Sequence, residues 1–269
     1  MGGSTILSAH GVSKTFSVKD GEIVAVKDLN FEVEEGDFVC LVGASGCGKS
    51  TLLNMFAGFT QPTSGEVRLR REPIIGVEPR CGMVFQSYAL LPWKTVSKNV
   101  QFGLKMQGVA RAEREETADR YIRMVNLEGF EDHYPPELSG GMQQRVTFAR
   151  ILAANPEVFL MDEPFAALDA MTRQVMQQEL LRIHEDSKKT TLFVTHNIDE
   201  ALVLSDTIVV MSARPGRVKT VVRNTLPRPR KIDVQLSPDY LRIKQEIWGQ
   251  VEEEVRAHME ATGVQMGDD

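Results

Sequence analysis

The chain has 269 residues, of which 42% are hydrophobic and 25% are charged, and this ordinary globular composition excludes a disordered chain. Its 31 basic and 37 acidic residues give a formal net charge of −6, so a general surface for nucleic acid or another polyanion is not expected. At about 150 residues per domain the length fits one large domain or two small ones, with a core that needs no disulfide or structural metal.

The cysteines and the apolar runs bear on where the chain resides. Cys40, Cys47 and Cys81 are too few for a disulfide framework or a zinc site, which indicates small buried residues in a reducing compartment. The N-terminus has neither the basic region nor the apolar region of a signal peptide. No apolar run approaches the about 20 residues that span a bilayer. We therefore expect a chain that is neither exported nor membrane-spanning, and that reaches a membrane only through a partner.

The first part of the chain is typical of strands arranged around a glycine-rich loop. Strands are predicted at 6–16, 23–33, 38–42, near Val67 and at 83–85. A turn signal formed by Lys19, Asp20 and Gly21 separates the first two strands. The third is a continuous apolar run, which is typical of a strand buried on both faces. A helix over about 49–57, ending at Gly58, follows the loop.

The rest of the chain alternates helices and strands. Residues 97–154 are mainly helical, with an interruption at Pro135 and Pro136. Helices are predicted at 111–125, 140–154, 171–186 and 198–204, and strands at 158–161, 191–195 and 207–211. Such alternation predicts a mostly parallel sheet with helices on its faces. A Pro/Arg-rich stretch at 226–230 and a charged amphipathic helix at 238–260 indicate a C-terminal appendage.

Residues 43–50 form the most informative motif. They read G-A-S-G-C-G-K-S and match the phosphate-loop pattern G-x-x-x-x-G-K-[ST] in full, between a predicted buried strand and a predicted helix. Glycines let the backbone curl so that successive N–H groups point at the phosphates, beside a helix N-terminus. Lys49 adds a positive charge, and the Ser50 hydroxyl is a ligand for Mg²⁺. The motif therefore indicates a nucleotide-binding loop rather than a simple glycine-rich turn.

A pair of acids follows the predicted strand at 158–161. A buried strand that ends in Asp162 places a carboxylate at the carboxyl edge of the sheet, where the phosphate loop also lies. Asp162 is then the natural partner of Mg²⁺, through water, and Glu163 can polarise an attacking water as general base. The two motifs together indicate a phosphate-loop nucleotidase.

Residues 138–145 narrow this large class. They read L-S-G-G-M-Q-Q-R, and a serine followed by two glycines that open a helix makes a second anion-binding helix N-terminus. This LSGGxQ sequence resembles the signature motif of ATP-binding cassette (ABC) proteins. Further residues match that family's pattern in order: Phe16 the adenine-stacking aromatic, Gln86 the Q-loop glutamine, Asp169 the D-loop aspartate (with Ala167 where serine is frequent) and His196 the switch histidine.

The resemblance covers roughly residues 6–225 and implies a fold. That fold is α/β, a P-loop NTPase of the ABC nucleotide-binding type, with a mostly parallel core sheet, an antiparallel β subdomain and an inserted α-helical subdomain. The expected ATPase domain is 1–225, with the helical subdomain inserted at about 88–154. Residues 226–269 would form a short C-terminal extension with one helix.

The resemblance also implies an ATP site that is completed only by a second chain, head to tail, with ATP and Mg²⁺ bound between the two. The residues that match the family's catalytic positions are Lys49, Gln86, Glu163 and His196. Those that match nucleotide-binding positions are Phe16, Gly43, Ala44, Ser45, Gly46, Cys47, Gly48, Lys49, Ser50, Thr51, Ser139, Gly140, Gly141, Gln143 and Asp169. Those expected at Mg²⁺ are Ser50, Gln86 and Asp162.

A finer similarity concerns transport. Residues 89–96, 212–218 and 226–230 look like the nitrate/sulfonate/taurine importer subfamily. This implies an ATPase that drives uptake of a small anion through a separate permease, and that lies peripherally on the cytoplasmic face of the membrane. Its partners would be a second ATPase subunit, the permease and, indirectly, a solute-binding protein, with no nucleic acid. An apolar cluster at Tyr88 and 90–93 fits permease docking, although internal packing of the helical subdomain explains it too.

Other functions compete with this interpretation. One alternative is the cassette of a lipid or drug exporter. A soluble ABC ATPase that acts on nucleic acid or the ribosome usually carries two cassettes, coiled-coil insertions or zinc modules, and the sequence shows none of these. A small-molecule kinase would not require the LSGGMQ segment. The transported solute cannot be inferred from the residues of this subunit.

Overall fold

The computed structural model describes residues 4–19, 21–230 and 232–262. Residues 1–3 and Asp20, the middle of the predicted turn, lie outside the described residues. The chain divides into two units, one formed by 1–78 with 188–269 (unit 1) and the other by 79–187 (unit 2).

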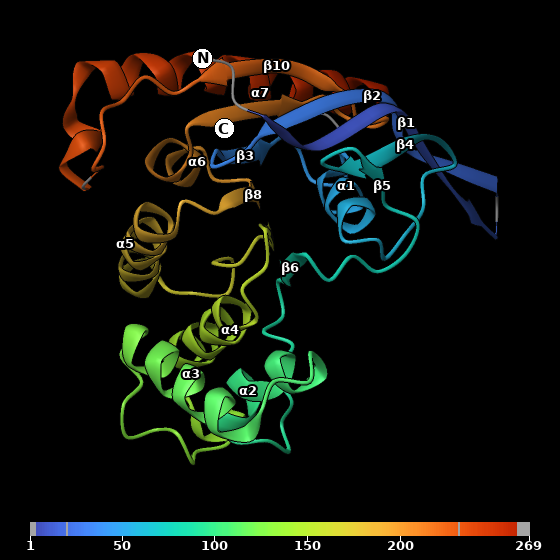
Figure 1. Cartoon of the computed structure of the whole chain (residues 1–269). Helices are drawn as coiled ribbons and strands as arrows, with labels where there is room; N and C mark the ends of the chain where they lie inside the picture. The colour runs from blue at the N-terminus through green and yellow to red at the C-terminus, as the bar shows by residue number, and fades with distance from the viewer. Residues whose placement is uncertain (1–3, 20, 231, 263–269) are drawn as a thin grey trace. The chain divides into compact units, whose positions relative to one another are not determined.

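Unit 1 contains an antiparallel sheet built on a long hairpin (Figure 1). Its strands are β1 (Thr5–Val18), β2 (Gly21–Glu34), β4 (Ser64–Leu69) and β5 (Glu72–Pro73), in the order β2-β1-β4-β5. Buried Leu29, Phe31 and Val33 alternate with more exposed neighbours along β2. Alternation of this kind buries one face of a sheet and leaves the other accessible, so the sequence pattern sets which face packs on the core.

The second sheet of unit 1 carries the parallel strands. They are β3 (Phe38–Val42), β8 (Thr190–Val194) and β9 (Thr207–Met211), with the antiparallel strand β10 (Val218–Arg223) at the edge, in the order β10-β9-β3-β8. Every residue of β3, β8 and β9 is buried, which explains their continuous apolar sequences. The helical segments of this unit are α1 (Lys49–Phe56), α6 (Ile198–Leu204), η2 (Ile232–Leu236) and α7 (Pro238–Thr262).

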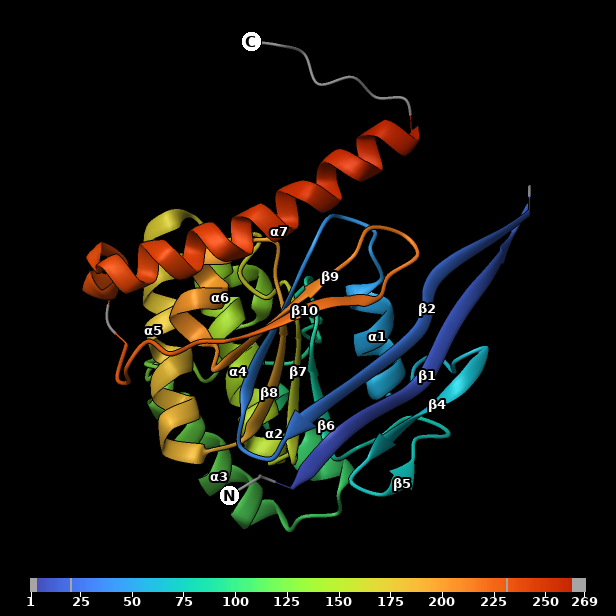
Figure 2. The same cartoon turned by 90° about the horizontal axis from the view of Figure 1, so that it is seen from above.

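The C-terminal helix α7 packs along α6 and the end of β9 (Figure 2). Tyr240, Ile243 and Ile247 form its buried face, at the spacing that places residues on one side of a helix. Through these contacts, the helix of the predicted C-terminal extension packs against the rest of unit 1.

Unit 2 contains a parallel strand pair and a group of helices. The strands are β6 (Cys81–Val84) and β7 (Val158–Asp162), and the helical segments are α2 (Val96–Met106), α3 (Arg111–Met124), η1 (Pro135–Glu137), α4 (Gly140–Ala154) and α5 (Ala170–Ser187). Helices α2, α3 and α4 pack on one another (Figure 1). Thr95 begins α2 as an N-cap whose hydroxyl accepts from the Lys98 N–H at 3.4 Å.

The secondary structure confirms most of the elements predicted from sequence. Two strands were not predicted: the short β5 and the edge strand β10, whose V-K-T-V-V-R sequence is half exposed and lacks the apolar run of the other parallel-sheet strands. The strand predicted at 83–85 is β6, which ends before Phe85. All three cysteines are buried and none of them is in a disulfide bond, as expected.

Among the described residues, no helix has both the length and the apolar character that would let it cross a bilayer. The two units divide the chain at 78/79 and 187/188. These divisions do not coincide with the predicted domain boundary at 225/226 or with the predicted insertion at about 88–154, which stay predictions.

Candidate nucleotide site

The phosphate loop joins the buried strand β3 to helix α1. Gly43, Gly46 and Gly48 all have positive φ, at 155°, 75° and 96°. At Gly48, the left-handed N-cap of α1, a Cβ would lie 2.8 Å from the Ala25 carbonyl oxygen, so only glycine fits this position without a shift. The first turn of α1 contains no acidic residue. The loop therefore leaves the helix N-terminus suited to an anion.

Lys49 is held inside this loop. Its side chain is buried, and its ammonium group donates to the carbonyl oxygens of Gly43 at 2.8 Å and Ala44 at 2.9 Å, with Cys47 Sγ at 3.5 Å. All three acceptors are neutral, so a phosphate oxygen is a stronger acceptor for this cation. Ser50 is exposed in the first turn of α1 and Thr51 is half-buried beside it. These residues fit a nucleoside phosphate with Mg²⁺ at the Ser50 hydroxyl.

His196 lies at the same edge of the sheet as the phosphate loop. Leu41 of β3 pairs with Val194 of β8 in parallel register, so Gly43 and His196 each follow two residues later. The Thr195 N–H donates to the Leu41 carbonyl at 3.2 Å, and the buried Thr195 hydroxyl donates to Glu200 at 2.6 Å. These bonds fix the backbone on which the exposed His196 side chain is placed.

Phe16 lies on β1, opposite Ile23 of β2. Its ring is 39% exposed, and the Lys14 ammonium lies 5.1 Å from the ring centroid. An exposed aromatic ring in a strand is available for stacking on a planar ligand, which is what the family pattern requires of it.

Unit 2 brings together Gln86 and the acid pair by the same register argument. Val84 of β6 pairs in parallel with Met161 of β7, so Gln86 and Glu163 both lie two residues beyond the paired positions. Asp162 is the last residue of β7, and Glu163 follows with a φ of 44° in the left-handed region. A non-glycine residue in this region is uncommon and clusters at functional sites.

The signature segment and the D-loop aspartate also lie side by side in unit 2. Ser139 is the N-cap of α4, and its hydroxyl accepts from the Met142 N–H at 3.3 Å. A Cβ at Gly141 would lie 2.7 Å from the Thr172 methyl group. The Thr172 hydroxyl donates to Asp169 at 2.6 Å and, with the backbone N–H groups of the same turn, lowers the pKa of that carboxyl. The α4 N-terminus and Asp169 thus form one surface.

Two further residues of the signature segment complete this surface. Gly140 begins α4 next to the Tyr88 hydroxyl, which would lie 2.9 Å from a Cβ at that position. Gln143, one turn into the helix, donates to the Leu138 carbonyl at 3.2 Å.

The predicted site residues thus form two groups, each assembled within its own unit. Unit 1 brings together the phosphate loop and His196, with Phe16 on the hairpin, and unit 2 brings together Gln86, the acid pair, the signature segment and Asp169. Within the described part of the chain, no three or more His, Cys, Asp or Glu side chains could jointly hold a metal ion.

One residue near the phosphate loop was not predicted. Arg214 Nε donates to the Gly46 carbonyl oxygen at 3.3 Å. Residues 212–218 indicate the importer subfamily, but their sequence predicts no role for Arg214 at the nucleotide site. Because β9 neighbours β3 in the sheet, the segment after β9 returns to the phosphate-loop edge, but the sequence alone does not reveal which strands are neighbours.

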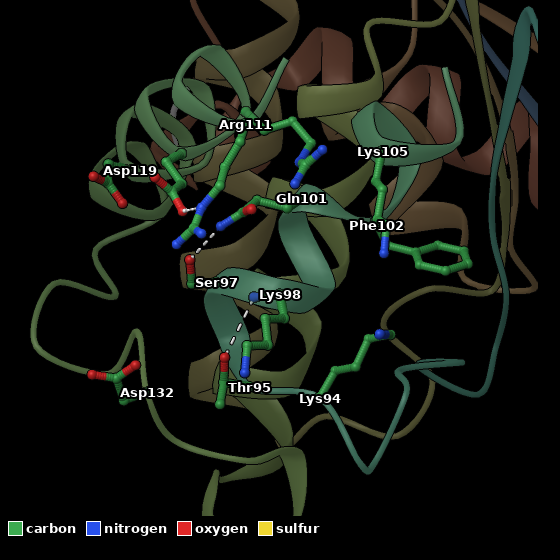
Figure 3. A pocket seen from close by; sticks show the side chains of 12 residues that line it. Lys94, Thr95, Ser97, Lys98, Gln101, Phe102, Lys105, Arg111, Asp119 and Asp132 are labelled. Atoms are coloured by element: carbon green, nitrogen blue, oxygen red, sulfur yellow. Dashed lines mark hydrogen bonds and ion pairs between the residues drawn. The ribbon is translucent and has the colours of Figure 1, made fainter. Parts of the chain in front are cut away.

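A separate cavity of about 800 Å³ opens between α2 and α3 in unit 2 and contains none of the predicted site residues (Figure 3). Its lining contains both basic and acidic groups: Arg111 pairs with Glu115 at 2.8 Å, and the Lys94 ammonium lies 5.9 Å from the Phe102 ring centroid. The lining residues are Lys94, Thr95, Ser97, Lys98, Gln101, Phe102, Lys105, Arg111, Arg114, Glu115, Asp119 and Asp132. Their mixed charge distinguishes this cavity from the phosphate loop.

The loop between a buried strand and a helix, with its enclosed lysine, defines the class of protein as a phosphate-loop nucleotidase. The family model described as ABC transporter matches residues 26–166. The chain belongs to this family, the ATP-binding proteins of ABC transporters.

Curated relatives support the same assignment over nearly the whole chain. An uncharacterized ABC transporter ATP-binding protein of Methanocaldococcus jannaschii, MJ0412, is 49% identical over 93% of this chain and 92% of its own length. The nitrate import ATP-binding protein NrtD of Synechocystis is 43% identical over 90% and 93%. The aliphatic sulfonates import ATP-binding protein SsuB of Bacillus cereus is 45% identical over 83% and 88%.

A solved structure gives the corresponding fold. The ATP-binding cassette MJ0796, in a dimeric post-hydrolysis state bound to ADP and Pi, is 34% identical with a TM-score of 0.73, covering 82% of this chain and all of that one. These findings confirm the ABC resemblance, the fold class and the assignment of the chain as an ATP-binding ATPase.

Proposed function

We propose that this chain is the motor subunit of an importer for a small anion, and that two such subunits bind two ATP molecules head to tail. The observation that carries the proposal is that one chain presents two anion-binding helix N-termini, α1 behind the phosphate loop and α4 capped by Ser139. In a head-to-tail dimer, each γ-phosphate would meet the α1 N-terminus of one protomer and the α4 N-terminus of the other, so both N-termini of each chain are used. The similarity to the dimeric cassette MJ0796 supports the same arrangement.

In this proposal each residue has a defined role. Lys49 and the loop N–H groups bind the β- and γ-phosphates, and Ser50, Gln86 and Asp162 hold Mg²⁺. When bound, Mg²⁺ would neutralise the negative charge that develops during phosphoryl transfer. Ser139 and the glycines after it contact the γ-phosphate held by the other protomer.

Hydrolysis then depends on positioning the attacking water. Glu163 accepts its proton, and His196, fixed through Thr195, contacts the γ-phosphate and keeps the water in line. Because phosphoryl transfer is dominated by positioning and charge neutralisation, closure of the dimer switches the reaction on.

The test of these roles is Glu163→Gln, which keeps the shape of the side chain and removes the base. We expect ATP binding within about twofold of the wild type, hydrolysis reduced by at least about 100-fold, and ATP-dependent dimers that accumulate. Glu128→Gln, an exposed acid in the same unit, is the matched control and should keep full activity. A Glu163→Gln protein that hydrolyses ATP at the wild-type rate would show that the base is elsewhere.

The transport role rests on a preformed surface in unit 2. Buried Asn99 donates to the carbonyl oxygens of Leu91, Lys94 and Thr95 at 3.2, 2.9 and 3.0 Å, and its own oxygen accepts from the Leu91 N–H at 2.9 Å. These bonds fix the segment while Trp93 stays 71% exposed. A fixed backbone that exposes a large aromatic ring is suited to a helix of a permease.

The relatives NrtD and SsuB carry import of nitrate and of aliphatic sulfonates in their names, which supports a small anion as the solute. In this proposal the permease holds the subunit at the cytoplasmic face of the membrane, a solute-binding protein acts indirectly through the permease, and no nucleic acid is bound.

Trp93→Ala tests the docking surface. We expect it to lose co-purification with the permease while the isolated subunit keeps its ATPase activity. The matched control is Trp248→Ala on α7, also an exposed tryptophan, at 58% exposure. A permease that still co-purifies with the Trp93→Ala protein would place docking elsewhere.

The solute is tested in the reconstituted complex. An importer should respond to nitrate or a sulfonate presented with the binding protein on the outer side. Stimulation by a lipid or drug from the ATPase side would favour the exporter instead.

A further inference from the structure

The segment 212–217 between β9 and β10, here called the backing segment, lies against the phosphate loop within unit 1. The Gly216 N–H donates to the Ala25 carbonyl at 2.9 Å, and the Gly216 carbonyl accepts from the Lys27 N–H at 3.1 Å. A Cβ at Gly216 would overlap the carbonyl oxygen of Cys47, a residue of the loop. The backing segment is therefore in contact with the loop through backbone atoms.

Arg214 of the backing segment holds one peptide of the loop. Its Nε donates to the Gly46 carbonyl at 3.3 Å, and a terminal nitrogen of its guanidinium would lie 2.9 Å from a Cβ at Gly46. In a trans peptide the carbonyl and the following N–H point in opposite directions. The Cys47 N–H donates to the Ala44 carbonyl at 3.3 Å, across the loop. By holding the Gly46 carbonyl, Arg214 thus fixes the orientation of the peptide that carries the Cys47 N–H.

The C-terminal helix fixes the backing segment from the other side. Glu254 of α7 accepts from the Ala213 N–H at 2.8 Å, directly before Arg214, and forms an ion pair with Lys219 at 2.9 Å. At the other end of α7, Tyr240 and Lys244 bond Asp199 at 2.5 and 2.7 Å. The helix is therefore anchored near its N-terminus and again at Glu254, whose partner Ala213 directly precedes Arg214.

We propose that Arg214 is a positioning residue for the phosphate loop and that α7, through Glu254, holds the segment that carries it. The role is indirect: Arg214 acts on the orientation of a loop peptide, and the loop binds the nucleotide. The inference rests on the proposed binding of ATP by residues 43–50.

The first test is Arg214→Ala. We expect the Kd for ATP and the KM to rise about fivefold, somewhat less than the roughly tenfold of a hydrogen bond from a charged donor because the site is exposed, while kcat stays within about twofold. Arg214→Lys, which keeps a cationic donor, should recover part of the affinity. The matched control is Arg217→Ala in the same segment, also exposed, which should leave the Kd unchanged.

The thermal midpoint separates this role from a purely structural one. A structural role would lower the Tm of the Arg214→Ala protein and leave the Kd of the folded protein as in the wild type. A Kd for the Arg214→Ala protein equal to that of the wild type would overturn the proposal. If the wild-type chain itself bound no ATP, the proposed function would fail instead, and the two failures are distinguishable.

The second test addresses the helix. Glu254→Ala should raise the Kd for ATP about threefold. Glu254→Gln keeps an acceptor for the Ala213 N–H and should keep much of the affinity. The control is Glu252→Ala, at an exposed acid on the same helix, which should leave the Kd unchanged. In the Arg214→Ala background, Glu254→Ala should cause no further loss, because both act through one contact. Additive losses would show that α7 does not act through Arg214.

Discussion

Tyr240→Phe isolates the contact by which α7 is anchored to α6. The Tyr240 ring is buried, at 1% exposure, and its hydroxyl donates to Asp199 at 2.5 Å. Burial, and then the hydrogen bond to Asp199, raise the pKa of Tyr240, so the hydroxyl remains a donor throughout the physiological range. The substitution keeps the packing of the ring and removes only the donor.

The expected loss follows from the surroundings of Asp199. A hydrogen bond to a charged group contributes about 1.5–3 kcal/mol. Asp199 is 42% exposed and keeps Lys244 at 2.7 Å, so it is not left buried and unpaired. We therefore expect the lower end, about 1.5 kcal/mol, which corresponds to about a tenfold increase in the local opening of α7. Tyr240→Ala also loses the aromatic packing and should cost about 3–5 kcal/mol.

Amide hydrogen exchange measures this opening directly. The amides of α7 should exchange about tenfold faster in the Tyr240→Phe protein, whereas the strands β3 and β8 should change little. Tyr134→Phe, at an exposed tyrosine, should change stability by no more than about 0.5 kcal/mol. Unchanged protection of α7 in the Tyr240→Phe protein would refute the claim that this bond anchors the helix.

Three further substitutions test the close contacts. Gly216→Ala should weaken ATP binding at least about tenfold, because the new Cβ would overlap the Cys47 carbonyl. The control is Gly249→Ala, whose Cβ would meet open space. It should be neutral or stabilise α7 by about 0.5–1 kcal/mol in thermal unfolding. Burial raises the pKa of Glu254, but the hydrogen bonds from Lys219 and from the Ala213 N–H lower it by more. The net pKa therefore lies below the usual 4.5. Its contribution is then complete above pH 4.5 and lost as the pH falls below that value. The protection factors of the α7 amides, which correct for the intrinsic pH dependence of exchange, should therefore fall on acidification in the wild type and show no such step in the Glu254→Gln protein. Asn99→Ala releases three carbonyl groups of the segment 91–95 that exposes Trp93. It should lower the free energy of unfolding by about 2–3 kcal/mol in denaturant and weaken capture of the permease. Full capture would count against a fixed docking surface.

The parts of the candidate site that the sequence predicts most directly belong to local patterns. The phosphate loop, Asp162 and His196 each follow an apolar run of strand length, and a strand end is legible in the sequence because the hydrophobic pattern stops there. Within each unit, the parallel register then brings the ends of the paired strands to the same edge, β3 with β8 and β6 with β7.

The residues that were not predicted depend on contacts between distant segments. Arg214 reaches Gly46 across 168 positions, and nothing in the sequence near either residue specifies that β9 and β3 are neighbours. The strand β10 was not predicted because Lys219, Thr220 and Arg223 interrupt its valines, a mixed pattern that is usual in an edge strand. The tail helix was predicted as an element, but its role was not, because Asp199 and Ala213 lie far away along the chain.

The central claim is that each ATP site is shared between two chains, and mixing two defective proteins tests it most directly. In the Glu163→Gln background, one differently tagged chain carries Lys49→Ala and the other carries Ser139→Arg. A mixed dimer keeps one intact pair, the phosphate loop of the second chain facing Ser139 of the first. We predict ATP-dependent capture of one tagged chain by the other, and none when either variant is present alone. If the mixture shows no capture while Glu163→Gln chains with no other change capture one another, the shared site is contradicted.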